Sequence, residues 1–280
     1  MPRSTSDKAL RFGLRKALVE PGRFKALLAL GQTFKPLVPG ALKSKMPPAP
    51  VDAGKRPDGK RHPRQMLILE GCVQPGLSPN TNAATARVLD RLGIGLTPAP
   101  EVGCCGAIDF HLNAQEAGRE RARRNIDAWL PHLDAGCEAI IQTASGCGAF
   151  VKEYVEVLAD DPDYAEKARR VSEAAKDLVE VLGQEDLTTL DVRADQRLAF
   201  HCPCTLQHAQ KLGGAVEAVL GRLGFGLTAV PDGHLCCGSA GTYNILQPEL
   251  ARKLRDRKVA NIRKTAPDII AAGNIGCITQ

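Results

Sequence analysis

The sequence is poor in aromatic residues and in long apolar runs. Only 4% of its 280 residues are aromatic, which argues against nucleic-acid binding by base stacking. No apolar run approaches the roughly 18–20 residues that a membrane-spanning helix requires. The first ten residues contain no apolar segment typical of a secretory signal, so we expect a cytoplasmic protein. The overall hydrophobic content of 44% is typical of globular chains and excludes a fibrous protein.

Acidic residues are scarce in the N-terminal part of the chain. Residues 1–64 contain 15 lysines and arginines against 4 acidic residues, a net charge of +11. Residues 65–280 contain 22 basic and 27 acidic residues, a net charge of −5. The excess of positive charge therefore predicts an anionic partner or surface near the N-terminus, and it argues against nucleic-acid binding by the main body.

The N-terminal part divides into an arm and a linker. Hydrophobic periodicity predicts a helix over 6–19 and a second helix from Pro21, which together form a basic helical arm at 1–43. Residues 44–64 contain five prolines and two glycines, which is typical of a linker. Two interpretations of residues 1–60 remain open. The arm packs on the main body or a neighbouring protein, or its basic face makes peripheral contact with a membrane.

The main body alternates short apolar runs with helical patterns. We expect strands at 66–69, 139–143, 198–201 and 269–272, and helices at 80–92, 149–158 and 212–223. Such alternation favours an α/β fold with parallel sheets. The run at 91–100 returns almost unchanged at 222–231, so the body contains two copies of one unit. We therefore predict two pseudo-symmetric parallel-sheet cysteine-rich domains, at 65–184 and 195–280.

Ten cysteines carry the chemistry of this repeat. Without an export signal, thiols serve more often as metal ligands or redox groups than as disulfides. Each copy spaces its first two cysteine positions by 32 residues, and half of the repeated cysteines follow a predicted strand. Ligands bind at the carboxyl edge of open parallel sheets, so these thiols are expected to converge. The candidate ligands are Cys72, Cys104, Cys105 and Cys147 in the first copy, and Cys204, Cys236, Cys237 and Cys277 in the second.

Both copies contain a Cys-Cys-Gly sequence. Vicinal cysteines form a strained disulfide, so the pair is better explained as two ligands on a sharp turn. Gly106 and Gly238 allow positive φ angles and close approach of the backbone to sulfur. Four thiolates suit either zinc or an iron–sulfur cluster. Structural zinc sites usually contain two short Cys-x₂₋₄-Cys knuckles, so the long spacing favours iron–sulfur.

The remaining cysteines and three histidines are secondary candidates. Cys137 precedes a predicted strand and is interpreted as a core residue. Cys202 is an additional candidate ligand without a counterpart in the first copy. His201, His208 and His234 flank ligand cysteines, where they either hydrogen-bond to a cluster or serve as packing and capping residues. The sequence contains no serine-nucleophile motif, no phosphate-binding glycine loop and no flavin fingerprint.

Five short stretches carry a family resemblance, at 71–75, 143–148, 204–208, 235–243 and 274–277. They resemble the cysteine-rich CCG domains that occur twice in one of the heterodisulfide reductase polypeptides and in the iron–sulfur subunits of lactate- and glycolate-oxidising complexes. The match is tightest with the iron–sulfur subunit of glycolate oxidase (glycolate dehydrogenase) and covers about residues 10–280.

The resemblance implies an electron-transfer subunit. A flavoprotein partner that carries FAD would oxidise glycolate to glyoxylate, and this chain would pass electrons toward a quinone-type acceptor. Two departures from the family pattern are visible. The ferredoxin-like region with two Cys-x-x-Cys-x-x-Cys-x-x-x-Cys-Pro runs is absent from this chain, and the chain stops three residues after Cys277. We therefore expect the second domain to lack its closing elements.

The resemblance also bears on the type of cluster. The heterodisulfide reductase type of this domain ends in Cys-x-x-Cys and supplies five thiolates, whereas Phe150 and Gln280 occupy the last position here. Four thiolates per copy predict an ordinary [4Fe–4S] cluster. Two alternatives remain: a lactate-oxidising or heterodisulfide-reductase-like subunit, and a zinc- or thiol-based scaffold that docks a flavoprotein without redox chemistry.

Overall fold

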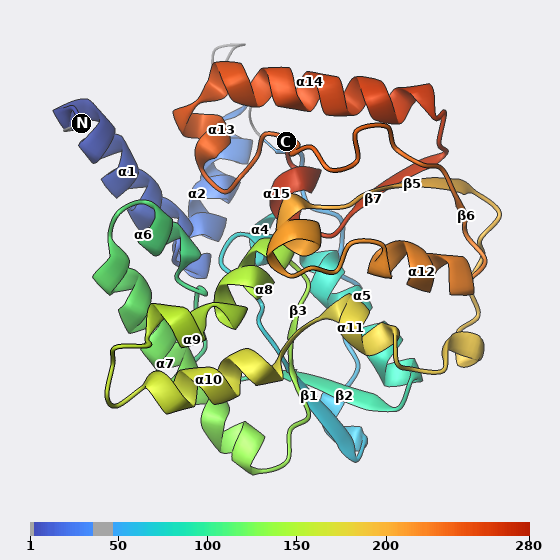
Figure 1. The fold of residues 1–280 in the computed structure, drawn as a ribbon, viewed down its shortest axis with the longest axis horizontal. Coiled ribbons are helices and arrows are strands. Elements are labelled where there is room, and N and C mark those ends of the chain that lie inside the picture. Colours follow the sequence, from blue (N-terminus) through green and yellow to red (C-terminus); the bar gives the residue numbers. More distant parts are fainter. Residues whose placement is uncertain (1–2, 36–46) are drawn as a thin grey trace.

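The structure is a computed structural model that describes residues 3–35 and 47–280, and it contains two parallel sheets (Figure 1). In these described ranges, the first sheet consists of β1 (Arg64–Ile68), β2 (Ile94–Pro98), β3 (Ile140–Gln142) and β4 (Ala175–Asp177). The second sheet consists of β5 (Arg197–His201), β6 (Gly226–Leu227) and β7 (Ile269–Ala272). The predicted α/β architecture with two parallel sheets is confirmed.

The two sheets repeat one topology. The strand orders are β2-β1-β3-β4 and β6-β5-β7, so β1, β2 and β3 correspond to β5, β6 and β7. All pairs are parallel, with Leu67 beside Ile140 in the first sheet and Leu198 beside Ile269 in the second. β2 and β6 lie within the repeated runs 91–100 and 222–231. The sequence pattern predicts no strand in either run. The sequence repeat is therefore also a structural repeat.

The helices that accompany the first sheet alternate with its strands along the chain. They are α4 (Gln74–Leu77), α5 (Pro79–Arg91), α6 (Ala107–His111), α7 (Gln115–Asp134), α8 (Ser145–Lys152), α9 (Tyr154–Val157), α10 (Ala165–Ala174) and α11 (Leu178–Leu182). The helix predicted at 80–92 corresponds to α5. The helix predicted at 149–158 is instead divided into α8 and α9, which meet at Glu153.

The second sheet follows a short turn, η3 (Leu187–Thr189). Its accompanying elements are a π-helical turn η4 (Thr205–Ala209), α12 (Ala215–Arg222), α13 (Tyr243–Leu246), α14 (Pro248–Lys264) and α15 (Ile275–Ile278). The helix predicted at 212–223 begins later, because Gly214 adopts a left-handed conformation with φ of 83° and serves as the N-cap of α12.

Strand β1 and the residue after it show why the first sheet is well buried. Met66 and Ile68 pack on one face with Leu89, whereas Leu67 and Leu69 pack on the other with Trp129. This alternation follows from the period of two in a strand, and burial on both faces is typical of parallel sheets. The second sheet is covered less completely, since Ile270 of β7 is 59% exposed.

The N-terminal arm packs on the first sheet's helices. It consists of α1 (Thr5–Leu18) and α2 (Pro21–Thr33), which lie at the edge of the molecule near α6 in Figure 1. Arg15 of α1 forms an ion pair of 2.5 Å with the buried Asp109 of α6. The predicted arm also includes residues 1–2 and 36–43, which lie outside the described residues.

The predicted linker is described from residue 47 onward, since 44–46 lie outside the described residues. Its regular structure there is one short turn, η2 (Gly59–Arg61). Gly59 packs closely on β2, because a Cβ at this position would lie 2.7 Å from the side chain of Thr97. This end of the linker therefore belongs to the packed body. No helix in the described ranges combines the length and the hydrophobicity needed to cross a bilayer.

Candidate metal centres

The repeated cysteines lie beyond the carboxyl ends of the strands. Cys72 follows β1, Cys147 lies in the first turn of α8 after β3, Cys204 is the N-cap of η4 after β5, and Cys277 lies in α15 after β7. The two Cys-Cys-Gly turns, at 104–106 and 236–238, join them from the loops after β2 and β6. The parallel topology therefore gathers four cysteines that are distant in sequence at each sheet edge.

The glycines of these turns are required by their geometry. Gly106 and Gly238 have φ angles of 97° and 89°, in the left-handed region that favours glycine. A Cβ would lie 2.7 Å from the carbonyl oxygen of Gly118 at the first position and 2.4 Å from that of Ala251 at the second. Because both neighbours are backbone atoms, neither turn can accept a side chain without a shift of the chain.

Three of the four thiols of the first set are buried, and neighbouring members of the set contact one another. Cys104 has no exposed surface, and Cys72 and Cys105 are also buried. The pKa of Cys104 is well below that of a free thiol, because the Cys105 and Cys72 thiols and the Gly106 amide stabilise its thiolate. Contact with Cys104 and burial raise the pKa of Cys72 and Cys105, and Cys147 lies beside Cys105. The four thiols of the first set thus contact one another in pairs, Cys72 with Cys104, Cys104 with Cys105, and Cys105 with Cys147.

Two buried polar side chains fix the first Cys-Cys pair. Asn125 of α7 donates a hydrogen bond of 3.0 Å to the carbonyl oxygen of Cys104 and accepts one from the Gly103 amide. The hydroxyl of Tyr154 donates a hydrogen bond of 2.6 Å to the carbonyl oxygen of Cys105. The sequence pattern singles out neither residue. The one sequence signal for Asn125 is its place as a lone asparagine on the apolar face of a helical pattern. An ordinary buried asparagine gives the same signal.

The second set has the same arrangement. The sulfurs of Cys204 and Cys236 lie 3.9 Å apart, and those of Cys237 and Cys277 lie 3.3 Å apart. The Gly238 amide donates a hydrogen bond of 3.2 Å to Cys236. Contacts with Cys204 and Cys237, together with this amide, lower the pKa of Cys236. In both sets, the first cysteine of the Cys-Cys-Gly turn is thus the favoured thiolate, the form that binds metal.

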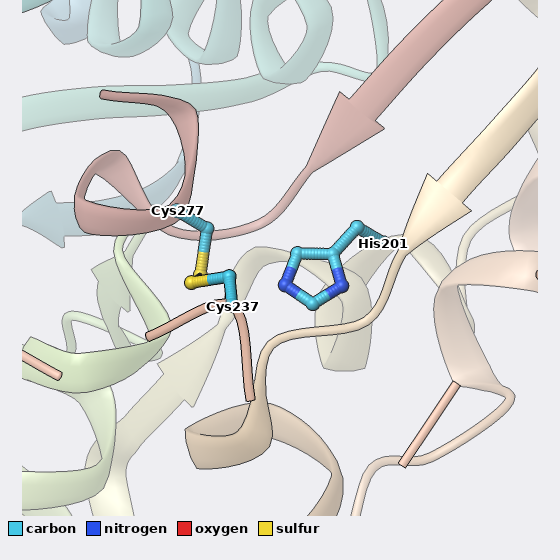
Figure 2. A group of neighbouring side chains, drawn as sticks. All are labelled: His201, Cys237 and Cys277. Carbon is cyan, nitrogen blue, oxygen red and sulfur yellow. Dashed lines mark hydrogen bonds between the residues drawn. The ribbon is translucent and has the colours of Figure 1, made fainter. Parts of the chain in front are cut away.

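His201, the last residue of β5, joins the second set. A ring nitrogen of His201 and the sulfurs of Cys237 and Cys277 all lie within 4.8 Å of one another. Figure 2 shows the imidazole ring beside the two cysteines, at the end of its strand. The pKa of Cys277 is lowered to about 6, mainly by contact with Cys237 and also by His201. The second set therefore contains a nitrogen donor besides its four sulfurs.

The two sets lie on facing edges of the two sheets. The turn at the start of α8, which carries Cys147, packs on η4, which follows Cys204. The hydroxyls of Ser145 and Thr205 hydrogen-bond at 2.8 Å, and Gln210 donates to the carbonyl oxygen of Ser145 at 3.0 Å. In Figure 1, α8 and α15 both lie near the middle of the molecule. The donor sets are therefore neighbours across this contact.

The donor chemistry fits iron–sulfur clusters. Each set offers four sulfurs from three loops, and in each set the first cysteine of the Cys-Cys-Gly turn is favoured as a thiolate and has a backbone amide directed at its sulfur. Iron–sulfur clusters are held by four cysteine thiolates and tuned by hydrogen bonds to sulfur. Zinc also accepts four thiolates, so the donor count alone does not distinguish the two.

Comparisons with known proteins distinguish them. The family of CCG cysteine-rich domains matches residues 66–152 and 198–280. The glycolate oxidase iron–sulfur subunit of Escherichia coli is 60% identical over 99% of this chain and 68% of its own length. The probable glycolate oxidase iron–sulfur subunit of Bacillus subtilis is 30% identical over 96% of this chain and 60% of its own length.

The chain belongs to the family of glycolate oxidase iron–sulfur subunits. More distant similarity extends to lactate utilization protein A of Bacillus licheniformis, which is 28% identical over 74% of this chain and 86% of its own length. The chain spans about two thirds of the length of the glycolate oxidase subunits that it matches.

Cys137 lies apart from both donor sets of this glycolate oxidase iron–sulfur family member. Its thiol donates a hydrogen bond of 3.2 Å to the carbonyl oxygen of Gln65, beside β1. Burial raises its pKa, which keeps the thiol protonated. Phe150, at the position of a fifth cysteine in related domains, is buried against Tyr154.

Two of the remaining candidates of this iron–sulfur family member line a small cavity in the second half. Cys202 and His234 line a cavity of about 190 Å³ together with His201 and Glu217. Burial raises the pKa of Cys202 to about 11, so it is a protonated thiol at neutral pH. His208 is exposed, and its Nε2 lies 3.2 Å from the carbonyl oxygen of His234. The structure brings none of these three into the group formed by His201, Cys237 and Cys277.

Proposed function

We propose that this chain is the electron-transfer subunit of a glycolate-oxidising flavoenzyme complex. The observation that carries the proposal is the pair of four-thiol sets on facing sheet edges, in a chain of the glycolate oxidase iron–sulfur family. A single metal set would suit a structural role, whereas two adjacent sets suit the passage of electrons from one to the other.

Eight cysteines would hold the clusters in this proposal. Each set supplies four thiolates, which suffice for one [4Fe–4S] cluster, and such clusters supply one-electron transfer. The chain's own residues position the thiols: Asn125 and Tyr154 hold the first Cys-Cys pair, and the amide of Gly238 supports the second. The corresponding domains would be 65–184 and 195–280, preceded by the arm at 1–43 and the linker at 44–64.

The remaining steps require a partner. Oxidation of glycolate to glyoxylate releases two electrons and two protons, which a flavin accepts together and passes on singly. We propose that FAD resides on a flavoprotein subunit and that the final acceptor is a quinone at the cytoplasmic face of the membrane. The exposed side of α1 carries Lys8 and Lys16, and that of α2 carries Arg23 and Lys25, which suits an anionic surface.

Anaerobic purification with iron and acid-labile sulfide analysis tests the proposal. We expect a coloured protein with iron and sulfide in equal amounts, and a spectrum that glycolate bleaches only when the flavoprotein is added. A colourless protein with bound zinc would instead support a scaffold that docks the flavoprotein. Turnover of glycolate with an artificial acceptor by the pure, flavin-free chain would contradict the division of labour between the subunits.

A further inference from the structure

His201 is a buried imidazole without a polar partner. It is 4% exposed, and within the described ranges neither Nδ1 nor Nε2 has a hydrogen-bond partner. Buried polar side chains are almost always paired, because an unpaired one keeps the full cost of losing its contacts with water. A histidine in this position therefore indicates a group that the protein chain itself does not supply.

The surroundings of His201 indicate what that group is. Its ring nitrogen lies within 4.8 Å of the sulfurs of Cys237 and Cys277, in the arrangement shown in Figure 2. Bonds from a metal to nitrogen or sulfur are roughly 2.0–2.3 Å long, so donors of one metal lie about 3–4.5 Å apart. The imidazole and the two thiols thus need little movement to share one metal centre.

The first half of the chain provides an internal comparison. His201 lies three residues before Cys204, and the residue three before Cys72 is Leu69. Leu69 is 3% exposed and packs in the apolar core beside the first thiol set. The fold therefore accepts a plain apolar side chain at this point of the sheet. Packing alone does not call for a histidine in the second copy.

A second polar group without a hydrogen-bond partner lies in the same cavity. Glu217 of α12 lines the same cavity as His201, and its Oε2 is buried without a hydrogen-bond partner among the described residues. A histidine that binds metal through one nitrogen usually donates the other N–H to a carboxylate, a carbonyl or water. Glu217 offers such a carboxylate, directly or through a water in the cavity.

We propose that His201 is a fifth protein donor to the second centre, which is thus held by mixed imidazole and thiolate donors while the first is held by thiolates alone. This inference rests on the proposed function for the presence of clusters. A neutral imidazole donates a lone pair and releases no proton, so it adds a ligand without adding negative charge.

Pulsed electron paramagnetic resonance tests the proposal on the full, cluster-loaded chain labelled with ¹⁵N-histidine. Spectra are recorded after reduction with dithionite and after oxidation with ferricyanide. We expect a ¹⁵N coupling that disappears in His201→Leu, a substitution that places the first copy's residue in the second. His234→Gln, at the rim of the same cavity, is the matched control and should keep the coupling.

Three outcomes would overturn the proposal. One is a loaded chain without histidine coupling in either state, and another is a coupling that survives in His201→Leu. A third is a coupling lost equally in His234→Gln. Iron analysis separates these results from failure of the proposed function, since a chain that binds no iron contradicts both. Circular dichroism of His201→Leu confirms that the fold is retained.

Discussion

The backbone amide of Ser145 donates a hydrogen bond of 3.0 Å to the carbonyl oxygen of Gly273. Ser145 lies two residues before Cys147, and Gly273 lies four residues before Cys277. The bond therefore joins the loop that carries a thiol of the first set to the loop that carries a thiol of the second. Because it involves backbone atoms, side-chain substitutions leave it in place. The relative position of the two donor sets is thus part of the fold.

The first prediction separates a ligand cysteine from a core cysteine. Cys105 is buried among the thiols of the first set, whereas Cys137 is hydrogen-bonded to Gln65 elsewhere. Cys105→Ser should therefore remove the iron of the first centre, about half of the total. Cys137→Ser should keep all of the iron. Iron and sulfide analysis of both proteins measures this, and iron loss from Cys137→Ser would show that the assignment is wrong.

The second prediction concerns the glycine of the second Cys-Cys-Gly turn. Gly238→Ala places a Cβ 2.4 Å from a backbone oxygen, at a φ of 89°. Strain of this kind costs about 1–3 kcal/mol from the backbone conformation alone, and the overlap must move Cys237 or α14. We expect loss of iron from the second centre and a lower melting temperature.

Gly226→Ala is the matched control for that substitution. Gly226 lies in β6 of the same sheet, has no positive φ, and has nothing within 4 Å of the position that a Cβ would occupy. Its iron content and melting temperature should stay close to those of the unsubstituted chain. Full iron retention in Gly238→Ala would contradict the close approach of the turn to α14.

The third prediction is a pH dependence of stability. Burial raises the pKa of Asp177 from 3.8 to about 6. The folded chain thus binds this proton more tightly than the unfolded chain, so stability falls as pH rises from about 4 to 6. The full shift corresponds to about 3 kcal/mol. Asp177→Asn keeps an acceptor for the Val179 amide and removes the buried charge.

Urea denaturation of the two proteins between pH 4 and pH 8 measures this effect. We expect the stability advantage of Asp177→Asn to grow as pH rises through 6 and to remain constant above 7. An advantage that is independent of pH would mean that Asp177 titrates normally in the folded chain.

The fourth prediction concerns the basic arm. Lys8 and Lys25 are exposed on α1 and α2, whereas Arg15 is engaged by Asp109. Lys8→Glu with Lys25→Glu should weaken binding to phosphatidylglycerol vesicles, because each basic residue near such a surface contributes about 1 kcal/mol. The binding should also weaken as salt rises. Co-sedimentation with vesicles measures both effects.

The same number of charge reversals on α14 is the control for the arm. Lys253→Glu with Arg263→Glu changes the net charge equally on another exposed helix. Iron content should be unchanged in both double variants. Equal loss of vesicle binding in the two would indicate a general charge effect rather than a contact through the arm.

Many of the candidate ligands are predictable from the sequence, because both copies of the repeat space their cysteines in the same way. The equal separation of Cys72 from Cys104 and of Cys204 from Cys236 predicts two equivalent sites without any knowledge of side-chain contacts. The strand ends that place these residues follow from apolar runs, since strands of a parallel sheet are buried on both faces.

Other features depend on long-range contacts that no local pattern reports. β2 and β6 contain glycine, which disfavours strands, yet they pair with β1 and β5. The roles of Asn125 and Tyr154 require that α7 and α9 lie beside the first Cys-Cys pair. The sequence likewise does not distinguish His201 from His208 and His234, whereas its burial and its position beside Cys237 and Cys277 do.

Under the proposed function, the unequal burial of the two donor sets would affect how electrons move through the chain. Three thiols of the first set are buried among apolar side chains such as Phe150, whereas only Cys237 of the second set is buried. Away from water, a change of charge rearranges few solvent dipoles, so the reorganisation energy of a hop is small. The first site thus suits rapid internal hopping, and the second suits handing electrons to a molecule that comes and goes.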